Sequence, residues 1–296
     1  MAAGSLEQVG AAADPCEPNY RMSAFIAEPF NALSALGLVL AGSNAMHQSR
    51  KYNFETRFMV LGFSVVIMGA SSMFFHATLS ERSKSWEEMA MVWSAFGWVA
   101  TLMHMSHSTN ETPSIAMVAA LGCGLWLSQM DLKPEFITIG SRVLLAAFGS
   151  AGVYLLHRCV NRFCNLPLFF ASERDQVILN PHPSTLKLQL MARWQIGCLL
   201  LAFLSLLVPS ISCSSTMGSF QPHALWHLLF GLSSHYGLQF AMALRQSILH
   251  KAPPATSWSL GGLLGCVVPT EVPSRAMGAQ LRWLLKMAGV DHLDPV

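Results

Sequence analysis

The sequence predicts an all-α membrane protein built as a bundle of seven transmembrane helices. Only 11% of the 296 residues are charged and 52% are hydrophobic, whereas soluble domains carry about a quarter charged residues. A helix that crosses a bilayer needs roughly 17 to 25 mostly apolar residues. Seven segments meet this requirement, at residues 24–46, 57–79, 88–106, 114–130, 136–157, 191–209 and 222–244.

Two of the seven segments depart from a plain apolar run. The segment 24–46 is interrupted by Asn31 and Ser34, which lipid would not solvate, so we expect both side chains to turn toward the interior of the bundle. The segment 114–130 is the shortest. The other five are long apolar runs with ordinary polar connections, and the largest connection is the segment 158–190, which we expect to be a polar loop.

Lysine and arginine residues predict the orientation, because cytosolic loops carry the excess of positive charge. Three basic residues lie between the first two segments, five lie between the fifth and sixth, and five lie in the tail. Only four lie on the opposite side. The N-terminus is therefore predicted to be lumenal or outside, and the C-terminus cytosolic.

Three parts of the chain follow from this topology: a lumenal segment 1–23, a catalytic bundle 24–250 and a cytosolic tail 251–296. The tail begins with the linker KAPPATS, and its apolar run LGGLLGCVVP is too short to span a membrane. Residues 275–289 place apolar side chains at roughly helical spacing beside three basic residues. They are either a helix on the membrane surface or a flexible tail.

Three histidines are predicted to lie at the lumenal face. His223 and His227, in HALWH, are four residues apart and share one face of a helix. His76 ends the second segment on the same side. Three histidine nitrogens with one open position form a common catalytic zinc site, in which zinc lowers the pKa of bound water. Ordinary interfacial histidines are the alternative, and His235, two turns deeper, is more typical of core packing.

Three further side chains near this face could assist a metal-bound hydroxide. Ser72 lies one turn below His76 and can donate a hydrogen bond to a developing oxyanion. Glu87 or Glu88, which open the third segment, can transfer a proton.

The N-terminal segment is rich in oxygen donors that suit calcium: Asp14, Glu17, Asn19 and Glu28. Their spacing is not that of an EF-hand loop, so a solvated acidic segment is the alternative. Cys16 and Cys213 are both predicted outside, where a disulfide can form in an oxidising compartment. Two free thiols are the other possibility.

Three blocks of the chain resemble the alkaline ceramidase family: DPCEPNYRMSAFIAEPFNALSAL, then SSMFFHATL followed by SWEEMAMVWS, then HALWHLLFGLSSH. The resemblance implies a seven-helix zinc amidase of the endoplasmic reticulum or Golgi membrane. Such an enzyme cleaves ceramide or phytoceramide to a sphingoid base and a fatty acid. The resemblance implies neither a nucleic acid nor an obligate protein as a binding partner. The implied residues are zinc ligands His76, His223 and His227, active-site Ser72, calcium ligands Asp14, Glu17, Asn19, Glu28 and the Pro15 carbonyl, and the disulfide cysteine Cys16 with Cys213 in a shifted partner position.

One position departs from the family pattern, which has Asp-Glu where this chain has Glu87-Glu88. The extra methylene moves the carboxylate by about one bond length, and a small displacement can lower a rate strongly. Either the backbone compensates or the enzyme is less active or differently selective. Pro15 also replaces an aromatic residue, which leaves the carbonyl available and stiffens the loop.

Two other functions are consistent with a seven-helix membrane protein. A seven-helix receptor of the progestin and adipoQ type resembles these hydrolases and retains a zinc site. A transporter would place ionisable residues near the middle of the bilayer, whereas here they gather at one face.

Overall fold

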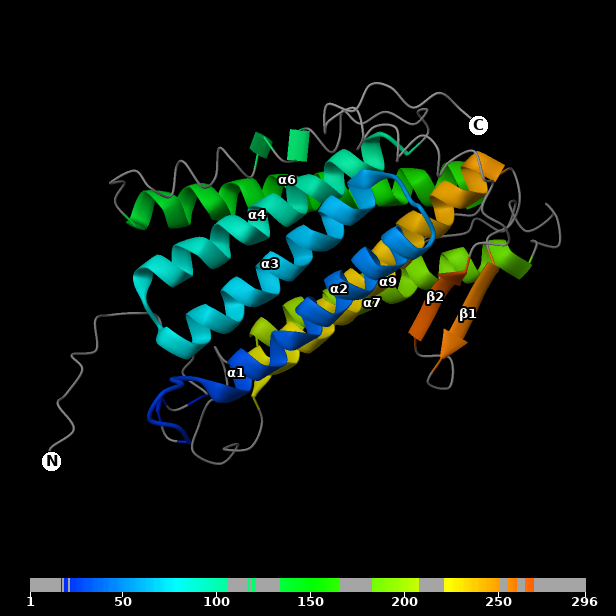
Figure 1. Ribbon diagram of the computed structural model, residues 1–296. Coiled ribbons are helices and arrows are strands. Elements are labelled where there is room, and N and C mark those ends of the chain that lie inside the picture. Colours follow the sequence, from blue (N-terminus) through cyan, green and yellow to red (C-terminus); the bar gives the residue numbers. More distant parts are fainter. Residues whose placement is uncertain are drawn as a thin grey trace, which may run out of the picture.

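The computed structural model describes residues 17, 19–20, 22–105, 116–117, 119–120, 134–164, 183–207, 221–250, 255–259 and 264–268. This part of the chain is a bundle of long helices with one β-hairpin (Figure 1). The helices are α1 (Pro29–Ser34), α2 (Leu36–Lys51), α3 (Thr56–Thr78), α4 (Glu81–Met103), α6 (Pro134–Cys164), α7 (Pro183–Leu207) and α9 (Pro222–His250). The strands β1 (Ala255–Ser259) and β2 (Leu264–Val268) pair antiparallel.

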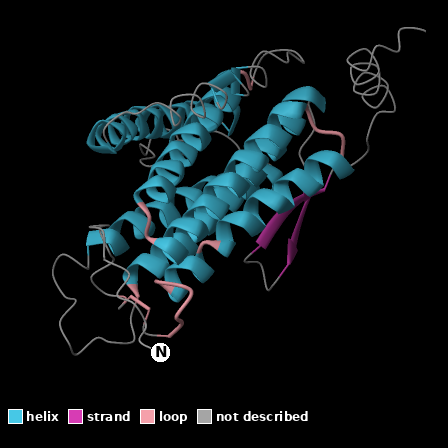
Figure 2. Ribbon diagram, turned by 60° about the vertical axis from the view of Figure 1, so that its left-hand side comes forward, coloured by secondary structure: helices cyan, strands magenta, loops and turns pink. Residues whose placement is uncertain are grey.

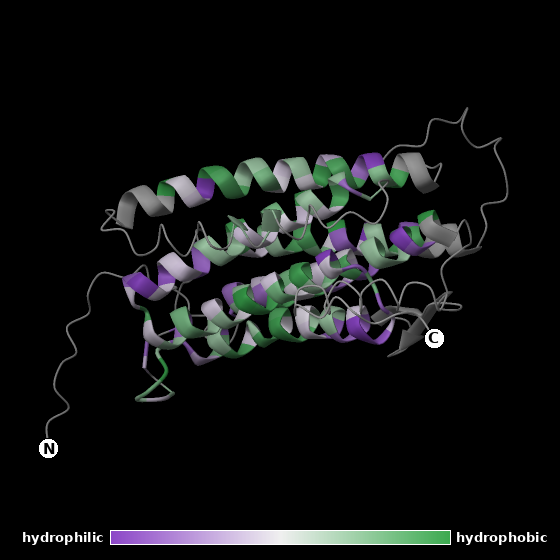
Figure 3. Cartoon of the chain, turned by 45° about the horizontal axis from the view of Figure 1, so that its top comes forward, coloured by the Kyte–Doolittle hydropathy of each residue, from purple (hydrophilic) through white to green (hydrophobic). Residues whose placement is uncertain are grey.

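The long helices lie side by side, and each packs against its neighbours along much of its length. α2 packs on α3 and α9, α4 lies between α3 and α6, and α7 packs on α9. Figure 2 shows the hairpin beside the bundle, where β2 contacts α9 and β1 contacts α7. Hydrophobic residues fill the middle of the helices and hydrophilic residues gather toward their ends (Figure 3).

The structure confirms that this is a helical protein with helices suited to cross a membrane. Among the described residues, three helices are long and apolar enough to cross a membrane: Thr56–Thr78, Ile139–Val160 and Leu188–Leu207. The segment 24–46 is divided at Ala35 into α1 and α2, and Asn31 and Ser34 are buried as expected. The segment 114–130 lies almost wholly outside the described residues.

Two expectations for the polar regions were wrong. The segment 158–190 was expected to be a loop, but α6 continues to Cys164 and α7 begins at Pro183. A helix satisfies its own backbone groups, so it continues past the apolar part of its sequence. The segment KAPPATS was predicted to be a linker, but its last three residues open β1, which pairs with β2 in the apolar run LGGLLGCVVP. The Trp, Thr and Val residues of this hairpin favour strands. The predicted surface helix 275–289 lies outside the described residues.

Glycines let α2 approach both α3 and α9. A Cβ atom added to Gly42 would lie 2.5 Å from the carbonyl oxygen of Gly62 in α3, and one added to Gly231 of α9 would lie 2.8 Å from the Gly37 carbonyl carbon. Small residues permit such close helix contacts in membranes. The contact at Gly231 lies one turn from His227, so this packing sets where α9 presents its histidines.

Candidate metal centre

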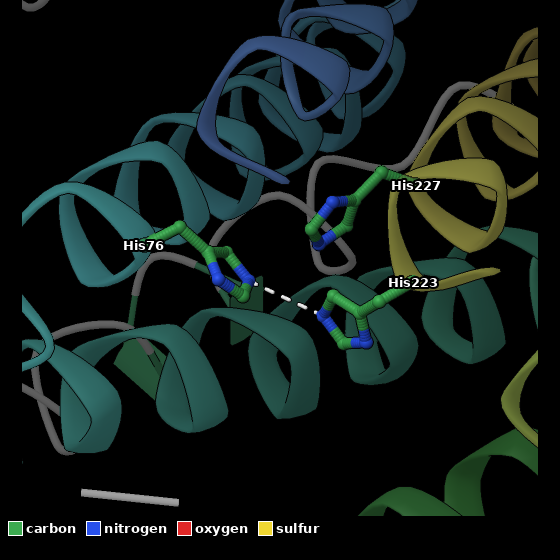
Figure 4. Close-up of side chains that lie close together, drawn as sticks. All are labelled: His76, His223 and His227. Carbon is green, nitrogen blue, oxygen red and sulfur yellow. Dashed lines mark hydrogen bonds between the residues drawn. The ribbon is translucent and has the colours of Figure 1, made fainter. Parts of the chain in front are cut away.

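Three imidazoles from two helices converge at one end of the bundle. His76 lies in the last turn of α3, and His223 and His227 lie in the first two turns of α9 (Figure 4). One ring nitrogen of each lies within 4.8 Å of the other two, and the Nε2 atoms of His76 and His223 are 3.2 Å apart. Tetrahedral zinc with nitrogens at about 2.0–2.1 Å separates ligand pairs by about 3.3 Å. The three side chains therefore fit a zinc ion.

Local backbone signals place these histidines at helix ends. Leu79 follows α3 with a left-handed φ of 50°, a conformation that commonly terminates helices. α9 begins at Pro222, and proline favours the first helical position because its fixed φ suits the helix and its missing N–H is not needed there. His76 and His223 are therefore each within a few residues of a helix terminus.

Glu28 holds the ring of His76. Its Oε2 atom lies 2.7 Å from His76 Nδ1, and the side-chain amide of Asn31 donates to the same oxygen over 3.1 Å. A buried carboxylate beside Nδ1 stabilises the proton on that nitrogen, which leaves Nε2 free to bind a metal. The sequence predicted Glu28 as a calcium ligand and gave no sign of this contact.

His227 is contacted on both ring nitrogens by buried serines. Ser34 Oγ lies 2.9 Å from Nδ1, and Ser72 Oγ lies 3.1 Å from Nε2. Ser72 was predicted as a site residue. Ser34 was not, although its expected inward orientation was the signal that could have identified it.

The two adjacent glutamates of α4 face different neighbours. Glu87 lies near both Ser72 and His76, close enough to His76 for electrostatic attraction. Glu88 accepts a 3.0 Å hydrogen bond from Ser141 of α6. Successive residues on a helix are about 100° apart around its axis, so only one of the pair can point at the histidines. The structure places Glu87 there.

Two of the proposed calcium ligands, Glu17 and Glu28, lie at the start of α1. The Glu17 carboxylate accepts hydrogen bonds from the backbone N–H groups of Phe30 and Asn31, at 2.8 and 3.0 Å. Within the described part of the chain, the Asn19 Oδ1 atom is buried without a hydrogen-bond partner. The Asn19 side-chain oxygen and the Glu17 and Glu28 carboxylates are the types of donor that calcium prefers. The remaining predicted residues of this region, Asp14, Pro15, Cys16 and Cys213, lie outside the described residues.

The fold and this cluster define a helical membrane protein with three histidines that could hold a metal ion. A family model described as ceramidase matches residues 7–264. The chain therefore belongs to the ceramidase family, and the predicted resemblance is confirmed.

Curated relatives agree with the family match. An alkaline ceramidase of Arabidopsis thaliana is 23% identical over 235 residues, covering 78% of this chain and 82% of that protein. Alkaline ceramidase 3 of Mus musculus is 21% identical over 254 residues, covering 81% and 86%. Alkaline ceramidase YPC1 of Saccharomyces cerevisiae is 33% identical over a shorter stretch of 81 residues, covering 27% and 26%.

Proposed function

We propose that this chain hydrolyses the amide bond of ceramide with a zinc ion held by His76, His223 and His227. As a member of the ceramidase family it is a ceramide amidohydrolase, and the proposal concerns how it performs the reaction. The observation that carries it is the convergence of three imidazoles from two helices, with Glu87 and Ser72 beside them.

The side chains around the centre have distinct roles in amide cleavage. Zinc at this centre would supply the nucleophile near neutral pH, because it lowers the pKa of bound water to about 7. Glu87 would accept a proton from the nucleophile and return it to the leaving amine. Ser72 would donate a hydrogen bond to the carbonyl oxygen as negative charge develops on it. Glu28 keeps the proton of His76 on Nδ1.

Calcium belongs to the same proposal. Glu17 and Asn19, with Asp14 and the Pro15 carbonyl, would bind it beside α1, and Glu28 would connect this region to His76. Such an ion would hold the N-terminal segment against α1. The oxygen donors gathered there support this assignment. A disulfide between Cys16 and Cys213 stays a prediction.

The membrane arrangement is also proposed. Seven transmembrane helices with a lumenal N-terminus and a cytosolic C-terminus put the metal centre at the lumenal leaflet of the endoplasmic reticulum or Golgi membrane. The distribution of lysine and arginine supports this orientation. Apolar helix faces would hold the acyl chain and the sphingoid tail of the substrate.

Metal removal tests the catalytic proposal. Purified protein in detergent is expected to contain about one zinc per chain, as a single His₃ site requires, and to hydrolyse labelled ceramide. Phenanthroline should remove the zinc and the activity together, and added zinc should restore both. Zinc-free protein with full turnover would contradict the proposal. Protein that binds zinc without cleaving any ceramide would favour the receptor alternative.

The two glutamates provide a matched comparison. Glu87→Gln is expected to lower kcat about 10²- to 10⁴-fold, because the amide keeps the shape of the side chain but cannot accept a proton. Glu88→Gln should change kcat little, since the amide oxygen can still accept the hydrogen bond from Ser141. Zinc content should be normal in both variants. Equal losses in the two variants would show that Glu87 has no special role.

A further inference from the structure

We propose that Ser34 is a positioning residue for the metal centre: its hydroxyl group fixes the tautomer of His227, so that the Nε2 atom faces the metal with a free lone pair. The inference rests on the proposed function, because it takes His227 as a zinc ligand.

The hydrogen bonds of Ser34 determine which atom of its pair with His227 is the donor. Its Oγ atom donates to the backbone carbonyl oxygen of Asn31 over 2.8 Å and lies 2.9 Å from His227 Nδ1. A serine hydroxyl has one proton and two lone pairs. The carbonyl can only accept, so the serine proton is directed toward it. The Oγ atom is then the acceptor toward His227, and Nδ1 carries the imidazole proton.

A neutral imidazole has one protonated nitrogen. With the proton on Nδ1, the Nε2 atom of His227 has the lone pair that a metal needs. The hydroxyl of Ser72, 3.1 Å from Nε2, can donate to this lone pair only while no metal is bound there, and a bound metal would take its place. Both serines and His227 are buried, so water does not compete for these positions.

The short helix α1 orients two of the three histidines. Glu28, directly before α1, contacts His76 Nδ1, and Ser34, its last residue, contacts His227 Nδ1. Glu17 fixes the start of this helix through the N–H groups of its second and third residues. The close approach of Gly37 and Gly231 holds α9 against the chain just after Ser34.

A second hydrogen-bond acceptor near His227 limits how much zinc affinity the loss of the Ser34 hydroxyl can cost. The backbone of Asn31 is also within hydrogen-bonding reach of His227, so its carbonyl can hold the ring in part when the serine hydroxyl is removed. Loss of the partner of a metal-bound histidine typically weakens metal affinity 10- to 100-fold. For Ser34 we expect a loss near the lower end of that range.

The experiment compares Ser34→Val with Ser34→Thr, which have nearly the same shape and differ in the hydroxyl group. Ser64→Ala is the matched control, because Ser64 is fully buried and donates to the Leu61 carbonyl over 2.7 Å without contacting a histidine. The zinc dissociation constant of each full-length variant is measured by competition with a chromogenic chelator. Thermal unfolding of the zinc-free proteins shows whether each variant folds.

Ser34→Val should bind zinc about tenfold or more weakly than Ser34→Thr, whereas Ser34→Thr and Ser64→Ala should stay close to the wild type. Cobalt in place of zinc should show an altered absorption spectrum in the valine variant alone. Equal affinities of the valine and threonine variants would overturn the role of Ser34 while leaving the zinc enzyme intact. A wild-type protein that binds no zinc would overturn the metal centre itself, and the inference with it.

Discussion

His76→Ala is expected to remove zinc binding and ceramide hydrolysis together. The variant deletes one of three metal ligands and leaves the Glu28 carboxylate buried without its imidazole partner. A catalytic metal contributes several kcal/mol of transition-state stabilisation, so the loss in kcat/KM should be about a thousandfold or more. Zinc analysis and turnover of labelled ceramide on the same preparation measure both effects.

His104→Ala is the matched control for this variant. Its imidazole lies at the end of α4, at the opposite end of the bundle, and contacts the Ala100 carbonyl of its own helix. The variant should keep zinc and most of the activity. If His76→Ala bound zinc as tightly as His104→Ala, His76 would not be a metal ligand.

The sequence could predict that the three histidines lie at the same face of the membrane. That prediction depends only on where the helices end and on which loops carry the basic residues. An apolar run fixes how a segment crosses the membrane, and basic residues fix its direction. His76 ends one such run, and His223 and His227 begin another. Antiparallel packing then brings the two ends together, whichever side chains line the contact between α3 and α9.

The partners of the histidines could not be predicted, because they depend on one irregular feature. The break at Ala35 separates α1 from α2 and lets Ser34 reach His227. A sequence pattern shows that a polar residue turns inward but does not show which side chain it meets. Glu28 was accordingly assigned to calcium alone, although it also contacts His76.

The sequence could not predict which of Glu87 and Glu88 faces the histidines. Both glutamates were possible proton carriers from the sequence, because the start of the helix was uncertain and its rotation about its own axis depends on packing. In the structure Glu87 lies near Ser72 and His76, whereas Glu88 contacts Ser141.

An ionic cluster at the opposite end of the bundle was not predicted from the sequence either. Glu55, just before α3, pairs with both Arg57 and Arg245. The Nε atom of Arg245 donates to Glu55 over 2.9 Å and its Nη1 atom donates to the carbonyl of Met105 over 2.7 Å, while Arg57 donates to the carbonyl of His104 over 2.8 Å. Charge counting treated these arginines as loop residues, but their side chains are almost fully buried.

In this cluster one glutamate pairs with two arginines, so one positive charge is not neutralised by a carboxylate. Both arginines also donate to backbone carbonyl groups at the end of α4. The negative end of a helix dipole stabilises cations. The cluster thus ties the start of α3, the end of α4 and the end of α9 together. It fastens these helices at the end away from the histidines, so it contributes to the stability of the bundle rather than to the metal centre.

Arg245→Met is therefore expected to be the most destabilising substitution at this end. It removes the bonds to Glu55 and leaves the carbonyl of Met105 without that donor, and breaking a buried ion pair by removing one partner costs about 3–5 kcal/mol. Denaturant unfolding in detergent should show this loss, while Arg50→Met, which removes an exposed arginine from α2, should show almost none.

His227 lies 18 residues earlier in α9, about 27 Å away, so the zinc affinity of the folded fraction should stay normal. Equal stability of the two arginine variants would show that the cluster does not hold the bundle together, and weakened zinc binding in the folded protein would show that it acts on the metal centre directly.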